Sequence, residues 1–178
     1  MAVNGQCNQI TNAFTKNMRM SIHPGVLRSM VTGYFVLSFY TFGALIIEND
    51  VNYQTWMAIG EAEFPAYHRK LQELLLPLFM IPLALQLLLS ILLLVSRQSF
   101  MAKPVIVIII LLNLYIILIS FLVQVPIHNE LNLHKNSLLL NQLIFTHQRL
   151  RLPAEILLFL VNVVQLFKII RQREINMG

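Results

Sequence analysis

Long runs without a charged residue alternate with short polar segments along this chain. Residues 29–47, 74–96 and 104–127 contain no Asp, Glu, Lys or Arg. A helix that crosses a hydrocarbon core of about 30 Å needs about 20 such residues. A fourth run, 152–170, also has spanning length and carries one Glu and one Lys near its ends, where their side chains can reach the interface. The pattern predicts four transmembrane helices.

Polar side chains recur within these runs and their extensions at intervals of four, seven and fourteen residues. A helical period of 3.6 residues puts such positions on one face. The positions on the four successive helices are Tyr34, Thr41 and Glu48; Gln72, Gln86 and Ser90; Asn113, Ser120, Gln124 and His128; and His147, Arg151, Glu155 and Asn162. A polar side chain finds no partner in hydrocarbon, so each stripe is expected to face another helix. The expected fold is all-α, an integral membrane four-helix bundle with its polar groups turned inward.

The segments outside the spans predict the remaining organisation. Residues 1–28 are polar, with apolar positions four residues apart that are typical of a short interfacial helix. The segment 48–70 joins the first two spans, and 128–151 joins the last two and holds apolar positions at helical spacing. We expect short interfacial helices in these two loops. Residues 171–178 form a basic C-terminal tail, and the transmembrane domain covers 29–170.

Composition supports the membrane class. Of the 178 residues, 57% are hydrophobic and 12% are charged, and the mean hydropathy is +0.67. A soluble domain carries about 25% charged residues, so an ordinary soluble globule and a disordered chain are excluded. The single cysteine, Cys7, excludes an intramolecular disulfide and a paired-thiol site. The net charge of +5 comes from basic residues that flank the apolar runs, which favours a lipid bilayer over nucleic acid as the partner.

The distribution of Lys and Arg predicts the orientation. Eight of the 13 basic residues lie on one side of the four spans and five on the other. The eight are Lys16, Arg19, Arg28, Arg97, Lys103, Lys168, Arg171 and Arg173. Because basic residues are enriched in cytoplasmic segments, this bias predicts that both termini are cytoplasmic.

Chemically capable side chains gather in the two loops opposite the termini. Four of the five histidines are there, together with carboxylates and arginines. The candidate site residues are His68, His128, His147, Glu130, Arg149, Arg151 and Glu155. Histidine can move a proton near neutral pH, and a fixed arginine can stabilise an anion or enolate. No histidine pair has the H-x-x-x-H spacing, so a metal requirement stays open.

Three short segments resemble a known family. They are Glu63–His68 (EFPAYH), Pro126–Leu131 (PIHNEL) and Thr146–Arg149 (THQR). In this order they resemble the small four-helix membrane proteins grouped with anthrone oxygenases, most of which have no assigned function. The resemblance extends over about residues 30–170. It implies oxygenation of an activated aromatic carbon without a dedicated cofactor, with His68, His128 and His147 as the positions carried over.

Two interpretations of function follow, and the sequence leaves both open. In the first, the protein is an enzyme that moves protons on, or oxygenates, a small hydrophobic or aromatic molecule that enters between the helices. In the second, it is a non-catalytic accessory subunit that packs in a larger membrane complex or a homo-oligomer. Whether a cofactor takes part is open in both.

Overall fold

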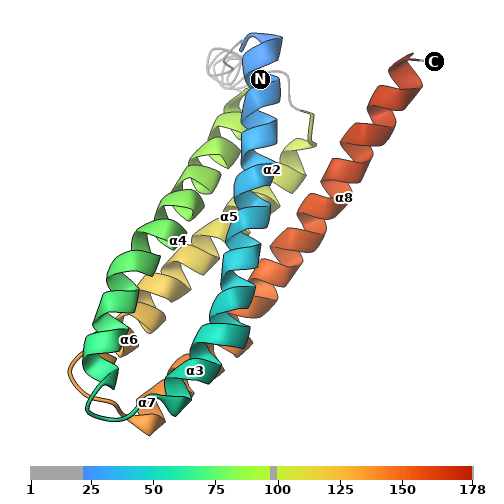
Figure 1. The fold of residues 1–178 in the computed structure, drawn as a ribbon. Helices are drawn as coiled ribbons and strands as arrows, with labels where there is room; N and C mark the ends of the chain where they lie inside the picture. The colour runs from blue at the N-terminus through green and yellow to red at the C-terminus, as the bar shows by residue number, and fades with distance from the viewer. Residues whose placement is uncertain (1–21, 97–99, 178) are drawn as a thin grey trace, which may run out of the picture.

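Four long helices make up this small membrane protein (Figure 1). The computed structural model describes residues 22–96 and 100–177, so most of the predicted N-terminal tail lies outside the described residues. The four helices, Pro24–Ala58, Phe64–Val95, Lys103–Leu131 and Ser137–Gln172, are each long and apolar enough to cross a membrane. The expected all-α four-helix architecture is confirmed.

Three of the long helices contain a π-helical turn that divides them into named segments. The first comprises α2 (Pro24–Ile47), a π turn (Glu48–Asn52) and α3 (Tyr53–Ala58), and the second is α4 (Phe64–Val95). The third comprises α5 (Lys103–Ile119), a π turn (Ser120–Gln124) and α6 (Val125–Leu131). The fourth comprises α7 (Ser137–Thr146), a π turn (His147–Arg151) and α8 (Leu152–Met177).

Local sequence signals set where the helices begin. Pro24, Pro65 and Pro104 each lie in the first turn of a long helix, where the missing N–H would have no intrahelical partner. The fourth helix begins instead at a side-chain cap. The Oδ1 atom of Asn136 accepts hydrogen bonds from the backbone N–H groups of Leu138 and Leu139, at 2.9 and 3.2 Å.

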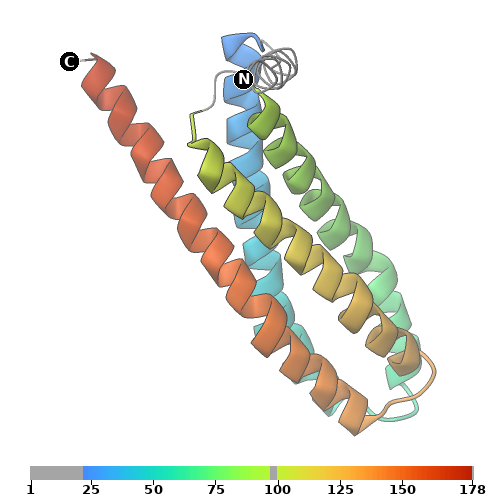
Figure 2. The same ribbon diagram turned by 180° about the vertical axis from the view of Figure 1, so that it is seen from behind.

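Successive long helices run in opposite directions, so the ends of the described chain lie at one end of the bundle (Figures 1 and 2). α2 packs against α4 and α8, and α5 packs against the same two helices. The opposite end, which we call the loop end, is formed by α3, α6, α7 and the connections at 59–63 and 132–136. The arrangement agrees with termini on one side of a bilayer, and the cytoplasmic side stays a prediction.

The helices extend well beyond the predicted spans. α4 begins at Phe64, ten residues before the charge-free run, and the fourth helix begins at Ser137 rather than near residue 152. The predicted apolar helix in the last loop exists as α7, but it continues directly into the last span instead of lying across the bundle. These extensions persist because they bury a second apolar core at the loop end, formed by Tyr53, Trp56, Phe64, Ile127, Leu131, Leu140 and Leu143.

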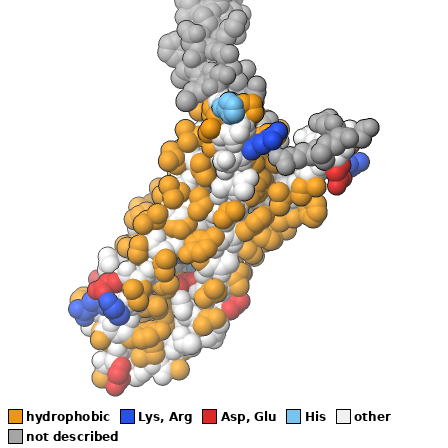
Figure 3. Space-filling view, turned by 45° about the horizontal axis from the view of Figure 1, so that its top comes forward, with side chains coloured by type: hydrophobic (Ala, Val, Ile, Leu, Met, Phe, Trp, Pro, Cys, Tyr) orange, Lys and Arg blue, Asp and Glu red, His pale blue; other side chains and the backbone are white. Residues whose placement is uncertain are grey.

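The outer surface of the bundle is largely apolar. Hydrophobic side chains cover most of the face shown in Figure 3. Large apolar side chains stay exposed along all four long helices, among them Val36, Leu85, Leu111 and Leu160. Such a surface is unfavourable in water and suits contact with lipid chains.

The predicted polar stripes face the interior. The Tyr34 hydroxyl donates to Asn162 Oδ1 at 2.8 Å, and Asn162 Nδ2 donates to Ser38 Oγ at 2.7 Å. The Thr41 hydroxyl donates to Gln86 Oε1 at 2.9 Å, and these five side chains are all buried. The stripes on α2, α4 and α8 therefore join these helices by hydrogen bonds in the middle of the bundle.

Replacing Tyr34 by Phe tests this network. The variant loses the hydrogen bond to Asn162, and interhelical hydrogen bonds in membranes contribute about 0.6 kcal/mol on average and up to about 1.7. We expect the free energy of unfolding, measured by denaturant titration in micelles, to fall by an amount in that range. Tyr115→Phe, at an exposed tyrosine on α5, is the matched control and should leave it unchanged. Equal effects of the two substitutions would contradict the role of the network.

Candidate functional site

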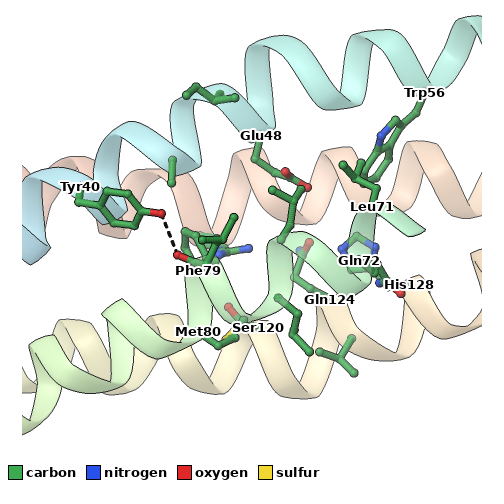
Figure 4. A pocket seen from close by; sticks show the side chains of 17 residues that line it. Tyr40, Glu48, Trp56, Leu71, Gln72, Phe79, Met80, Ser120, Gln124 and His128 are labelled. Carbon is green, nitrogen blue, oxygen red and sulfur yellow. Dashed lines mark hydrogen bonds between the residues drawn. The ribbon is translucent and has the colours of Figure 1, made fainter. Parts of the chain in front are cut away.

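A cavity of about 270 Å³ lies towards the loop end of the bundle. Residues of all four long helices line it, and Figure 4 shows side chains from several of them converging on one space. Its polar lining consists of Tyr40, Glu48, Trp56, Gln72, Ser120, Gln124, His128 and Arg151. The rest of the lining is apolar and consists of Ala44, Ile47, Leu71, Leu75, Leu76, Leu78, Phe79, Met80 and Val125.

The three π turns lie at the level of this cavity and supply much of its polar lining. Glu48 begins the first turn, Ser120 and Gln124 bound the second, and Arg151 ends the third. In each turn a backbone N–H reaches the carbonyl five residues back, as Tyr53 does to Glu48 at the first. A π turn adds one residue to the helical repeat and turns side chains out of the regular register, and such turns are frequent at functional sites.

Proline explains two of the π turns. Pro126 and Pro153 each lie two residues after a π turn. Proline has no N–H, and its ring collides with the carbonyl four residues earlier, which in both cases belongs to the π turn. The wider turn moves that carbonyl away from the ring while keeping the helix continuous. The two prolines therefore determine where the third and fourth helices widen.

A proline in α4 shapes the cavity wall in another way. Pro82 cannot donate to the carbonyl of Leu78, four residues earlier. The Tyr40 hydroxyl donates to this carbonyl instead, at 3.1 Å (Figure 4). Both Tyr40 and Leu78 line the cavity, so the bond joins α2 to α4 at its edge. Pro77 and Pro82 both lie inside α4, and the cavity lies beside this stretch of the helix.

A chain of hydrogen bonds runs from the loop end to the cavity. Asn132 Nδ2 donates to Gln72 Oε1 at 2.6 Å, and Asn132 Oδ1 contacts His68 Nδ1 at 2.7 Å. His68 Nε2 in turn contacts His128 Nδ1 at 3.1 Å. Because the Asn132 oxygen can only accept, His68 carries its proton on Nδ1 and accepts at Nε2. His128 then donates from Nδ1, and its Nε2 atom keeps a free lone pair.

Aromatic side chains enclose the two imidazoles. Trp56 lies edge-on to both, with ring centroids 4.9 Å from His68 and 5.8 Å from His128. Phe64 stacks on His68 at 5.2 Å. His147 lies in the same cluster, where its Nδ1 atom is 3.3 Å from the Tyr53 hydroxyl. The structure therefore brings His68, His128 and His147 together at the loop end.

Arg151 places a positive charge beside the cavity. Its side chain is only 6% exposed, and its guanidinium lies 4.2 Å from the centre of the Phe79 ring. Among the side chains that the structure describes, the one ion pair closer than 4.0 Å joins Lys70 to Glu73, so none of their carboxylates is in contact with Arg151. Its electrostatic neighbours at longer range are Glu155, Glu48 and Tyr53.

Of the three remaining candidates, one lies next to the site and two lie outside it. Glu155 is buried one turn after Arg151, and one of its carboxylate oxygens has no hydrogen-bond partner. Glu130 and Arg149 are exposed and do not line the cavity. The guanidinium of Arg149 lies 5.9 Å from the Phe145 ring on the outside of the fourth helix. Five of the seven predicted residues thus lie in or next to the site, and two lie outside it.

Sequence reasoning missed three participants. Asn132 follows His128 by four residues, so helical spacing alone could have placed the two on one face. Tyr53 follows Glu48 by five residues, and residues at this spacing lie one above the other only across a π turn. Trp56 is 1% exposed and packs on the imidazoles, and its place in the loop between the first two spans gave no sign of that contact.

The described side chains also bear on metal binding. The part of the chain that the structure describes holds no group of three or more His, Cys, Asp or Glu side chains arranged for a metal ion.

Comparisons of the chain with protein-family models, with curated proteins and with solved structures find no match.

The environment of Trp56 gives a direct test of this geometry, because it is the one tryptophan in the chain. Phe64→Ala should open the aromatic cluster, raise quenching of the indole fluorescence by iodide, and lower the free energy of unfolding by about 3–5 kcal/mol. Leu133→Ala, at an exposed side chain of the adjacent connection, is the control and should change neither quantity. Strong iodide quenching in the unsubstituted protein would show that Trp56 is not enclosed.

Proposed function

We propose that this protein is a membrane-embedded enzyme that binds a small hydrophobic molecule in the cavity and removes a proton from it with His128. The observation that carries the proposal is the directional chain from Asn132 through His68 to His128. A general base needs a free lone pair within reach of the substrate, and the chain leaves one on Nε2 of a histidine that lines the cavity.

The surroundings of His128 support this role. Trp56 and Phe64 hold the imidazole pair in place and keep its surroundings apolar, so the base competes with little water for the substrate proton. His68 orients His128 and stabilises the cation that forms when Nε2 takes up the proton. In this proposal His68 is a positioning residue, and His128 is the catalytic one.

Arg151 supplies the complementary charge. Removal of a proton leaves an electron pair, and therefore a negative charge, on the substrate. A fixed guanidinium in a site of low polarity stabilises that charge without having to reorganise. Arg151 lines the same cavity as His128 and has no carboxylate in contact that would neutralise it.

The resemblance to the anthrone oxygenase group extends the proposal to oxygenation. In that chemistry, an activated CH₂ group loses a proton to the base, and the resulting carbanion reacts with O₂. Reaction of one CH₂ group with one O₂ yields one carbonyl and one water, so atoms and electrons balance with dioxygen as the only co-reactant. The apolar cavity beside His128 is suited to hold an aromatic body of this kind.

Deuterium exchange tests the proton step separately from oxygenation. The purified protein in nanodiscs is incubated without O₂ in D₂O with anthrone, whose CH₂ group is activated, and exchange is followed by NMR. We expect the protein to accelerate exchange above the buffer rate, and His128→Gln to lower the acceleration by roughly 10²–10⁴-fold. His134→Gln, at an exposed histidine of the nearby connection, is the matched control and should retain it.

The outcomes separate the two interpretations of function. Loss of exchange in folded His128→Gln, with His134→Gln unaffected, supports the enzyme. Equal rates in all three proteins would refute the assigned base. An unsubstituted protein that never exceeds the buffer rate, and that leaves mild detergent only as part of a larger assembly, would favour the accessory subunit.

The tautomer of His128 is a second test of the proposal. In protein with ¹⁵N-labelled histidine, we expect His128 to carry its proton on Nδ1 and a bare Nε2, assigned by comparison with His128→Gln. Asn132→Leu removes the acceptor that orders the chain, so it should mix the two tautomers of His68 and His128 and slow the exchange reaction. Asn132→Asp keeps an acceptor oxygen and should restore the single tautomer. An ordered tautomer in Asn132→Leu would contradict the chain.

A further inference from the structure

We infer that the ligand of the cavity is a hydrophobic carboxylic acid, which enters from the bilayer between α2 and α4 and places its carboxylate against Arg151. The inference rests on the proposed function in taking this cavity as the substrate site, and it adds the class of substrate and its route. It comes from three features of the cavity: its apolar mouth, the unpartnered polar atoms of its lining and the state of its charges.

The mouth faces the surroundings of the bundle. Four residues that line the cavity are also exposed on the outer faces of α2 and α4, namely Tyr40, Ile47, Leu76 and Leu78. Leu76 and Leu78 are 52% and 56% exposed. Because these faces carry the apolar side chains that suit lipid contact, the opening is directed towards the hydrocarbon rather than towards water.

The rim of the mouth offers little polarity to an entering molecule. The one hydroxyl there, on Tyr40, is engaged by the Leu78 carbonyl at 3.1 Å. That bond also satisfies the carbonyl that Pro82 leaves without its helical partner. The body of the ligand therefore meets an apolar passage, as an alkyl chain or a ring system would require.

Three of the side chains that line the cavity carry buried polar atoms without partners. Trp56 Nε1, Arg151 Nε and Gln124 Oε1 are all buried without a hydrogen bond, and all three residues line the cavity. Their side chains are 1%, 6% and 2% exposed, respectively. A buried polar group without a partner costs about 1–3 kcal/mol, so a ligand that pairs with such groups gains affinity. Two of the three atoms are donors, which points to a ligand head rich in acceptor oxygens.

The charges select a carboxylate among such heads. The guanidinium of Arg151 is a planar fork with five N–H donors that matches two carboxylate oxygens. Phe79 covers one face of that fork and leaves its edges available. Glu48 lines the same cavity, but its Oε2 atom already accepts from Asn52 at 2.6 Å, and it makes no ion pair with Arg151. The guanidinium therefore has no carboxylate in contact, and an ammonium head would be repelled by it.

Fluorescence of the single tryptophan can measure occupancy. Protein in nanodiscs is titrated with 2-bromododecanoic acid, whose bromine lies next to the carboxylate and quenches an indole on contact. The control probe is 2-bromododecan-1-ol, which has the same chain and no charge. We expect saturable quenching of Trp56 by the acid, reversed by unbrominated dodecanoic acid, and at least tenfold weaker quenching by the alcohol. Equal quenching by the two probes would overturn the inference.

Three variants locate the carboxylate. Arg151→Gln should weaken acid binding by roughly 10- to 100-fold, the range of a charge-assisted hydrogen bond of about 1.5–3 kcal/mol. Arg149→Gln, at the exposed arginine two residues away, is the matched control and should bind as the unsubstituted protein does. Glu48→Gln removes the negative charge from the lining and should strengthen acid binding several-fold. Should Arg151→Gln fail to fold, Arg151→Lys, which keeps the charge but not the fork, should still prefer acid to alcohol by a smaller factor.

The quenching experiment and the exchange experiment test this inference and the proposed function independently, because the anthrone probe of the proton step carries no carboxylate. Acid-selective quenching that depends on Arg151, without any proton exchange, would keep this inference and refute His128 as the base. Proton exchange without a preference for the acid would keep the base and overturn the inference. Acid binding that is unchanged in folded Arg151→Gln would also overturn it.

Discussion

The structure depends on the requirement that every backbone N–H and C=O group surrounded by hydrocarbon finds a partner within the protein. Pro82, Pro126 and Pro153 break that rule locally, and the chain answers in two ways. Before Pro126 and Pro153, a π turn moves the carbonyls to new positions. At Pro82, a tyrosine from another helix supplies the missing donor. The π turns and the tyrosine all line the same cavity, so the site is a direct product of backbone hydrogen bonding.

The architecture was predictable from the sequence because it depends on regular periods. Charge-free runs of spanning length fixed the number of helices, and stripes such as Tyr34 with Thr41 turned inward as their spacing required. The helix ends were not predictable in the same way. α4 and the fourth long helix extend beyond the predicted spans, where tertiary packing of Trp56 and its neighbours, rather than local hydropathy, keeps the helices formed.

The site was predictable only in part. His68, His128 and His147 come from different helices, and their meeting depends on the up-and-down topology that the spans implied. Arg149 and Arg151 were both candidate residues, and only Arg151 belonged to the polar stripe predicted for the fourth helix. The structure separates them, with Arg151 inside and Arg149 outside. A regular 3.6-residue period does not describe positions across the π turn, so spacing alone misses contacts such as that of Tyr53 with His147.

The bond between the Tyr40 hydroxyl and the Leu78 carbonyl acts as a latch between two helices. A bulky molecule that passes this point must part α2 from α4, which breaks the bond and exposes the orphaned carbonyl to hydrocarbon. Breaking the bond adds the same cost to the barrier in both directions, so entry and departure slow by the same factor. A molecule bound behind such a latch therefore leaves more slowly than it would through an opening without that bond.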